Sequence, residues 1–192
     1  MHGSGPTRPP SNVETADADL ARRAGQGDAS AFAVLAERHW PRLVRLSRSV
    51  VGAAEAEDVV QESLVVAWNR MGTLRDPAAF PAWMLRIVAR LAVRAARRWS
   101  WRRLLPFSEL PERADPAPVL EAERRDVERV LARLPPRQRA VMHLTVIEGM
   151  SDGEIGEALG MDAATARSHR RKARVAIRRI LGVVGPGEGE DS

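Results

Sequence analysis

The chain has 192 residues, of which 44% are hydrophobic, enough for packed cores in one domain or in two small ones. It contains no cysteine, which excludes a disulfide framework, a thiolate zinc site and a cysteine redox switch. The 30 basic and 25 acidic side chains leave a net charge of only +5, but the basic ones concentrate in residues 86–103 and 167–179. One such block could be a solvated helix face; two favour a polyanion bound at two places.

Both ends of the chain are polar and lack an apolar core. Residues 1–16, rich in glycine, proline and serine, are predicted to be a disordered N-terminal segment rather than a secretory signal. Residues 183–192, which include the run GPGEGEDS, are predicted to be a disordered acidic tail. No stretch of about twenty apolar residues occurs, so no membrane insertion is expected. The lack of cysteine is typical of a reducing, cytoplasmic location.

Residues 17–98 are predicted to form a first helical domain, because their apolar side chains recur at helical spacing and no alternating run indicates a strand. A short helix is expected at Asp17–Ala24. A second helix is expected to be capped by Asp28 or Ser30, kinked or restarted at Pro41, and ended by Gly52.

The stretch AEAEDVVQESLVVAWNRM predicts a third helix with an apolar stripe that includes Trp68. The polar positions off that stripe include Asp58, Gln61, Glu62 and Asn69. The loop GTLRDPAAFP follows, in which Asp76 and Pro77 suit the N-cap and the first turn of the next helix.

A further helix is predicted from Ala82 to about Arg98, with its arginines along one side. These arginines are Arg86, Arg90, Arg94, Arg97 and Arg98. Arginines near aromatic residues, here Trp83 and the loop residue Phe80, are typical of surfaces that bind single-stranded nucleic acid. Trp83 and Trp68 nevertheless lie on apolar stripes, so both are predicted to be core residues.

Residues 99–118 carry four prolines without a clear period and are predicted to be an irregular linker. Residues 119–182 are predicted to form a second helical domain. Its first helix is expected to begin at Val119, to bury Leu134 and to end at Pro135. The next helix, Arg137–Glu148, is expected to have an apolar inner face made of Val141, Leu144 and either Val146 or Ile147.

The sequence GMSDGEIGEALGMDAATARSHRRKAR predicts a helix–turn–helix. Ser151 and Glu154 form a capping box for a short helix that stops at Gly160, and Asp162 caps a second helix from Ala163. In this motif the second helix enters the major groove of DNA. Its candidate DNA-binding residues are Thr165, Arg167, Ser168, His169, Arg171, Lys172 and Arg174. An ordinary helix pair with a basic solvent face is the alternative.

No set of catalytic residues is recognisable. The histidines are scattered, and the sequence has no P-loop, HExxH or GxSxG pattern. Four carboxylates lie within two helical turns without a histidine, which favours a solvated or partner-facing acidic patch over a metal site. They are Glu55, Glu57, Asp58 and Glu62. The sequence therefore predicts no enzyme, no metal site and no cofactor.

Four segments together resemble bacterial sigma factors, and the two-domain length is similar to that of the extracytoplasmic-function (ECF) group. They are AEDVVQESLVVAW, FPAWMLRIVARLAVRAARR, LPPRQRAVMHLTVIEGMSDGEIGEALGM and ATARSHRRKAR. The resemblance covers about Asp28 to Leu181. It implies that the polar positions of the third helix dock on the coiled coil of the largest subunits of core RNA polymerase. These docking residues are Asp58, Gln61, Glu62 and Asn69.

The resemblance also implies contacts with promoter DNA. The loop Thr73–Phe80 and the following helix would hold the displaced single strand of the −10 element, and the helix–turn–helix would read the −35 element as a duplex. The implied −10 contacts are Thr73, Arg75, Phe80, Arg86, Arg90, Arg94, Arg97 and Arg98. The linker would pass through the polymerase interior, and an anti-sigma factor is a further partner common in the family.

Five positions depart from the family's usual pattern in ways that affect these contacts, among them Ala166 in place of a common valine and His169 in place of a common arginine. Arg90 stands where asparagine is common and Arg94 where aspartate is common, so the −10 helix is more basic than usual. In the second helix of the helix–turn–helix, Arg170 replaces a common leucine that packs inward. That helix is therefore expected to be packed more loosely or to be rotated differently.

The sequence thus predicts an all-α protein with two small helical domains joined by an irregular linker, the C-terminal one containing the helix–turn–helix. Its predicted function is that of a sigma factor that binds core RNA polymerase and directs initiation from −10 and −35 elements. The alternative is a free-standing helix–turn–helix regulator that binds duplex DNA without polymerase, usually as a dimer. The acidic and basic surfaces of the first half argue against this alternative.

Overall fold

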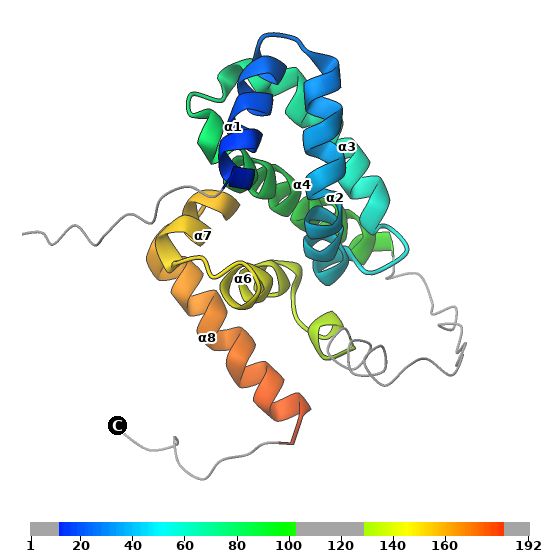
Figure 1. Ribbon diagram of the computed structural model, residues 1–192. Helices are drawn as coiled ribbons and strands as arrows, with labels where there is room; N and C mark the ends of the chain where they lie inside the picture. Colours follow the sequence, from blue (N-terminus) through cyan, green and yellow to red (C-terminus); the bar gives the residue numbers. More distant parts are fainter. Residues whose placement is uncertain (1–11, 103–128, 183–192) are drawn as a thin grey trace, which may run out of the picture.

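The structure, a computed structural model, describes residues 12–102 and 129–182, and every regular element in these stretches is a helix (Figure 1). The elements are α1 (Asn12–Gly25), α2 (Ala29–Val51), α3 (Ala56–Arg70), the 3₁₀ turns η1 (Met71–Thr73) and η2 (Pro77–Ala79), α4 (Phe80–Arg102), α6 (Pro136–Val146), α7 (Asp152–Leu159) and α8 (Ala163–Ile180). Residues 129–132 are also helical. The predicted all-α class is confirmed. Residues 103–128, with the expected helix start at Val119, lie outside the described residues, as do 1–11 and 183–192.

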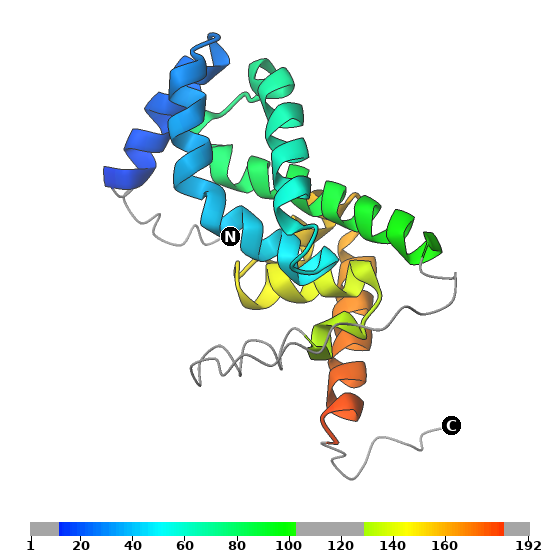
Figure 2. The same ribbon diagram turned by 90° about the vertical axis from the view of Figure 1, so that its right-hand side faces the viewer.

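Helices α1 to α4 form a bundle in which α2 packs against the other three (Figures 1 and 2). Its fully buried side chains lie one or two helical turns apart on each helix, as expected for amphipathic helices around one core. They include Leu35, Leu43, Leu46 and Val50 of α2, Val60 of α3, and Phe80, Met84 and Val88 of α4. Full burial of one such side chain contributes about 1.5–3 kcal/mol, so packing rather than local propensity stabilises the bundle.

The first helix begins earlier than the sequence predicts. α1 starts at Asn12, inside the segment that was expected to be disordered. The side chain of Asp17 is buried and forms ion pairs with Arg38 and His39 of α2, with 2.9 Å between His39 Nε2 and Asp17 Oδ2. This carboxylate ties α1 to α2, a tertiary contact that helical periodicity does not reveal.

Helices α2 and α4 both continue past a point where a helix boundary was considered. α2 continues through Pro41, so the helix does not restart there, and Leu35 and Leu43 on either side of Pro41 are both buried in the bundle. α4 continues to Arg102, beyond the expected end at Arg98 and into the predicted linker. No proline or glycine occurs in this extension, so nothing in the local sequence breaks the helix.

The predicted helix caps are confirmed. Asp28, Asp76 and Asp162 accept hydrogen bonds from backbone N–H groups two or three residues ahead, at 2.6–3.0 Å. Ser151 and Glu154 form both hydrogen bonds of the capping box. These hydrogen bonds favour the ionised carboxylate, and they lower the pKa values of Asp28, Glu154 and Asp162.

Helices α6, α7 and α8 pack around a second group of buried side chains. This group includes Val141, Leu144, Ile155 and Ala166. Val146 and Ile147 are 65% and 57% exposed, so the prediction that one of them faces inward is wrong. α6 ends at Val146, and the two side chains fall beyond the part of the helix that packs.

Two glycines determine how α7 meets α8. Gly160 ends α7 with φ +68°, a left-handed conformation that costs glycine little. A Cβ atom at Gly156 would lie 2.7 Å from the carbonyl oxygen of Met161, so α7 approaches the turn this closely only because that side chain is absent. The predicted helix–turn–helix is confirmed, with a tightly packed turn.

The two halves of the chain pack against each other. α6 lies against α2, α7 lies against α4, and the buried side chains of both halves belong to one continuous cluster. The C-terminal end of α8 points away from the α1–α4 bundle in both views (Figures 1 and 2). The expected domain limits, 17–98 and 119–182, stay predictions.

Candidate polymerase and nucleic-acid interfaces

One face of α3 carries the predicted polymerase contacts. Asp58, Gln61, Glu62 and Asn69 are all exposed. Val65, which is 62% exposed, and Trp68, which is 36% exposed, fall on the same face at helical spacing. The face therefore combines carboxylates with apolar surface, a composition suited to a protein partner. Sequence analysis did not single out Val65, because it lies in a run of three branched aliphatic residues, 64–66, and the run alone does not show which of them is exposed.

The aromatic residues are arranged differently from the prediction in two cases. Trp68 is not a core residue: it lies at the edge of the bundle, with its ring centroid 5.3 Å from that of Phe32. Phe80 is fully buried at the start of α4, with ring centroids 5.6 Å from His39 and 6.1 Å from Trp83. Its expected position on an accessible, DNA-binding loop is therefore wrong. Trp83 is half-buried against the core, as predicted.

The loop before α4 keeps two of its predicted contacts at the surface. Thr73 and Arg75 are both exposed, and the Thr73 hydroxyl donates a hydrogen bond of 2.7 Å to the carbonyl oxygen of Arg70. The Asp76 cap fixes the start of the following 3₁₀ turn. The loop is therefore ordered by its own hydrogen bonds, with its polar side chains accessible.

The arginines on α4 fall into two groups. Arg90 donates hydrogen bonds from Nε to the Ala158 carbonyl oxygen (2.8 Å) and from Nη2 to that of Glu157 (2.6 Å). Arg86 Nη2 lies 3.2 Å from Glu157 Oε2. These oxygens are at the C-terminal end of α7, where the helix dipole favours a cation. The other predicted −10 contacts on α4, Arg94, Arg97 and Arg98, are exposed.

A buried carboxylate adds a second polar contact between the halves. Glu148, whose side chain is 3% exposed, accepts a hydrogen bond of 2.7 Å from Arg42 Nε of α2. Its other oxygen lies 3.5 Å from His143 Nε2. Burial raises the pKa of Glu148, but the Arg42 guanidinium and the His143 imidazole outweigh it and lower the pKa to about 2. Sequence analysis missed this cluster, which joins residues far apart in the chain.

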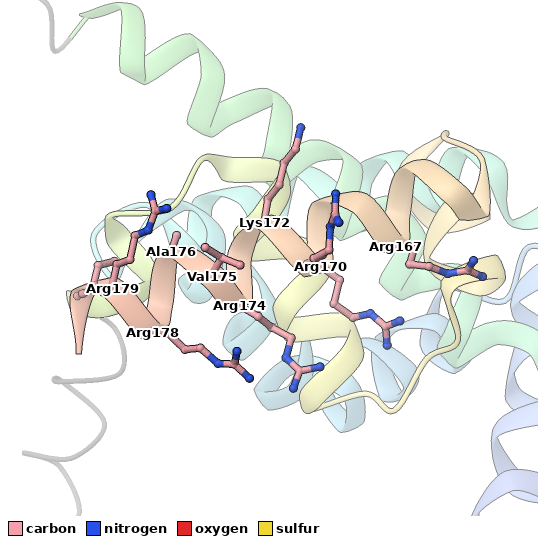
Figure 3. A pocket seen from close by; sticks show the side chains of 10 residues that line it. Arg167, Arg170, Lys172, Arg174, Val175, Ala176, Arg178 and Arg179 are labelled. Carbon is pink, nitrogen blue, oxygen red and sulfur yellow. The ribbon is translucent and has the colours of Figure 1, made fainter. Parts of the chain in front are cut away.

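The basic residues of α8 line an open groove along the helix (Figure 3). They are Arg167, Arg170, Arg171, Lys172, Arg174, Arg178 and Arg179. Of the predicted −35 contacts, Arg167, Arg171, Lys172 and Arg174 are exposed, and Thr165, Ser168 and His169 are partly buried. Burial, with Arg137 and Lys172 nearby, lowers the pKa of His169 below 6.5. The lowered pKa favours the neutral form of the His169 imidazole.

Asp152, at the start of α7, connects that helix to two arginines of α8. Its Oδ2 lies 3.2 Å from Arg167 Nε and 2.9 Å from Arg170 Nη2. Ala166 and Ala173, one turn on either side of Arg170, are fully buried. Arg170 thus occupies the inward face of α8, and the ion pair compensates its charge there. The expectation that α8 is packed more loosely, or rotated differently, than is usual in the family stays a prediction.

Two protein-family models match the chain. One, described as Sigma-70 region 2, matches residues 35–102 and includes the exposed face of α3 and all of α4. The other, described as Sigma-70, region 4, matches residues 124–177 and includes the helix–turn–helix. Over 175 residues, 91% of this chain, the sequence is 31% identical to the ECF RNA polymerase sigma factor SigM of Mycobacterium tuberculosis (strain ATCC 25618 / H37Rv), covering 89% of that protein. The chain belongs to the ECF sigma factors of RNA polymerase.

Other sigma factors are similar to this one in sequence and in fold. It is 32% identical over 177 residues to the RNA polymerase sigma factor NccH of Alcaligenes xylosoxydans xylosoxydans, covering 86% of this chain and 94% of NccH. The structure of CnrH in complex with the cytosolic domain of CnrY is similar with a TM-score of 0.64 and 28% identity, over 88% of this chain and 99% of that one. The match of the first half to region 2 leaves the free-standing regulator without support.

The part of the sigma factor that the structure describes contains neither a metal-binding cluster nor a membrane-spanning helix. No group of three or more His, Asp or Glu side chains there is placed to hold a metal ion. No helix within residues 12–102 and 129–182 has the length and apolar character needed to cross a membrane.

Proposed function

We propose that this sigma factor uses three separate surfaces for its three macromolecular contacts. The exposed face of α3 binds core RNA polymerase, the arginines of α4 bind the displaced strand of the −10 element, and the basic face of α8 binds the −35 duplex. The observation that carries the proposal is the separation of charge: carboxylates lie on the α3 face, and arginines lie on α4 and α8. Polymerase and DNA therefore meet surfaces of different chemistry.

The basic face of α8 suits a duplex. Its arginines and lysine can neutralise phosphates along the groove, and release of the counterions drives binding at low salt. The N-terminal part of the helix, with Thr165 and Arg167, reaches furthest toward base edges in a helix–turn–helix complex. Ser168 and His169 are partly buried, so they are less accessible to DNA than the exposed residues of this surface.

The proposed −10 contact requires a change in the arrangement of the two halves. The N–H groups of Arg90 that donate to the carbonyl oxygens of α7 cannot donate to DNA phosphates at the same time. Arg86 is likewise paired with Glu157. We therefore expect α7 to move away from α4 when the sigma factor engages the polymerase and the displaced strand.

The proposal also includes a protein that holds the factor inactive. The similar factor CnrH is solved in complex with another protein, the cytosolic domain of CnrY, and we expect an anti-sigma factor to bind this chain. The sigma factor would act in the cytoplasm, where the polymerase and the promoter are, and would contribute no catalytic group of its own.

Run-off transcription with purified core polymerase, on the DNA upstream of the protein's own coding region and on a randomised promoter pool, tests the proposal. A specific transcript is expected only when both the chain and core polymerase are present. If the chain instead binds duplex DNA specifically without core polymerase and yields no transcript with it, the free-standing regulator is the better description.

Charge reversal on α3 tests the polymerase surface. We expect Asp58→Lys and Glu62→Lys each to reduce co-purification with core polymerase at least tenfold. In each variant a positive charge replaces a negative one at an interface that is proposed to depend on complementary charge. Glu37→Lys, an exposed site on α2, is the matched control and should leave binding unchanged. Circular dichroism would establish that the helices remain intact. Equal binding by all three variants would show that the α3 face is not the docking surface.

A further inference from the structure

Asp152 clamps two arginines of the predicted recognition helix, as described above. The two guanidinium groups that it holds differ in position. Arg170 is 34% exposed on the inward face of α8, whereas Arg167 is 69% exposed beside the DNA-facing surface. The second carboxylate oxygen, Oδ1, is buried and accepts no hydrogen bond within the described part of the chain. The charge of Asp152 is therefore compensated through Oδ2, by these two arginines.

The carboxylate is held firmly with respect to α8. Asp152 is the first residue of α7, directly after Ser151, whose capping box fixes the first turn of that helix. The close approach of Gly156 to the Met161 carbonyl sets the distance between α7 and α8. The position of Oδ2 relative to the Arg167 backbone therefore follows from the fold of the turn and not from a mobile side chain.

The atom of Arg167 that Asp152 engages decides which edge of the guanidinium stays available. The contact is to Nε, at 3.2 Å, so the edge formed by the two Nη groups is not engaged by Asp152, and the Arg167 side chain is 69% exposed. A guanidinium presents its N–H groups in a planar fork, and the outer edge can donate to two acceptors at once. In the major groove, guanine offers such a pair in O6 and N7, whereas adenine offers one acceptor and one donor.

We propose that Asp152 is a positioning residue that holds Arg167 with its Nη edge directed at a guanine of the upstream promoter element, and so determines specificity at that base pair. The proposal rests on the proposed function, in which α8 lies in the major groove. Without the carboxylate, Arg167 can turn toward the phosphates, which bind arginine independently of sequence. Arg170 keeps Asp152 in place from the inward side of α8.

The test uses holoenzyme assembled from core polymerase and the full chain. A randomised upstream element is first selected with wild-type holoenzyme, and binding is then measured with each base substituted in turn. Asp152→Asn should lose about tenfold or more of the preference for one guanine, while binding to unrelated duplex is unchanged or stronger. Replacing that guanine by 7-deazaguanine, which lacks the N7 acceptor, should weaken wild-type binding and leave the variant unaffected.

Two further variants separate positioning from a merely structural role. Arg167→Lys keeps the charge but loses the fork, so it should lose the same preference, and the double variant should be no worse than Arg167→Lys alone. Asp19→Asn breaks an ion pair on the surface of α1, Asp19–Arg22 at 2.7 Å, and should change neither preference nor affinity. Thermal unfolding of each variant shows whether α7 and α8 stay folded.

The possible outcomes distinguish the two claims. If wild-type holoenzyme enriches a guanine and Asp152→Asn retains that preference, the positioning role of Asp152 is refuted while the proposed function stands. If Asp152→Asn weakens binding equally for all sequences, the carboxylate is structural and the inference is also refuted. If wild-type holoenzyme enriches no upstream element, the proposed function fails and the inference fails with it.

Discussion

Helices α4 and α8 both carry arginines at helical spacing, but their basic faces lie in different surroundings. On α4, Arg86 and Arg90 contact the C-terminal end of α7, so this part of the face is occupied by the protein itself. On α8, the basic side chains line an open groove (Figure 3). The spacing of arginines therefore predicts that a helix is basic, whereas the packing of neighbouring helices decides whether DNA can reach its basic side chains.

The largest expected effect is a loss of unfolding free energy when the contact between the two halves is weakened at Glu148. Glu148→Gln removes a buried charge that compensates Arg42 and lies beside the buried His143. Because the pKa of Glu148 is lowered from 4.5 to about 2, the carboxylate contributes about 3 kcal/mol of stability at neutral pH. We expect urea unfolding at pH 7 to show a loss of roughly this size, with the exposed Glu57→Gln as control.

The pH dependence checks the same assignment. A carboxylate with a lowered pKa stabilises the folded state fully above its unfolded value of 4.5, and this contribution is lost as the pH falls toward 2. The difference in unfolding free energy between wild type and Glu148→Gln should therefore be constant above about pH 5 and should shrink on acidification. A difference that stays constant down to pH 3 would place the effect elsewhere.

The hydrogen bonds of Arg90 give the next largest effect. Hydrogen bonds to a charged group contribute about 1.5–3 kcal/mol when buried, and these are partly exposed, so Arg90→Ala should weaken the contact between α4 and α7 by about 1–2 kcal/mol. Small-angle scattering of the isolated chain should show a larger radius of gyration for this variant. Arg94→Ala, one turn further along α4 and exposed, should leave it unchanged. Equal compaction of both variants would mean that Arg90 does not hold the halves together.

The smallest effect concerns individual charges on α8. Lys172→Ala should reduce the slope of log K against log salt for −35 duplex binding by about 0.9, the value for one phosphate contact. His169→Ala should leave that slope unchanged at pH 7.5, because burial, Arg137 and Lys172 lower the pKa of His169. A reduced slope for His169→Ala would show that the imidazole is protonated when DNA is bound.

Much of the architecture could be predicted from local sequence signals. Helical periodicity identified the all-α class. Aspartates at the expected helix starts identified the caps at Asp28, Asp76 and Asp162, whose side chains accept hydrogen bonds from N–H groups two or three residues ahead. The capping box and Gly160 marked the helix–turn–helix, because both act within a single turn. These predictions were right where the deciding interaction is between residues close together in the chain.

The wrong predictions concern residues whose burial depends on contacts with residues that are distant in the sequence. Phe80 follows a turn, so it was assigned to a surface loop, but it fills the core between α2 and α4. Trp68 lies on an apolar stripe, yet no other helix covers its ring completely. Pro41 was expected to kink or restart α2; the helix does not restart there, and residues on both sides of Pro41 are buried.

The sequence by itself determined that this sigma factor is helical, where its caps lie and which helices are basic, since these properties depend on interactions over one or two turns. Only the tertiary structure decided which of those basic residues are available. Arg90 faces α7 and Arg170 faces Asp152, although nothing near either residue in sequence indicates a partner. A charge is compensated by whatever packing brings within a few ångströms, and helical spacing alone carries no information about that.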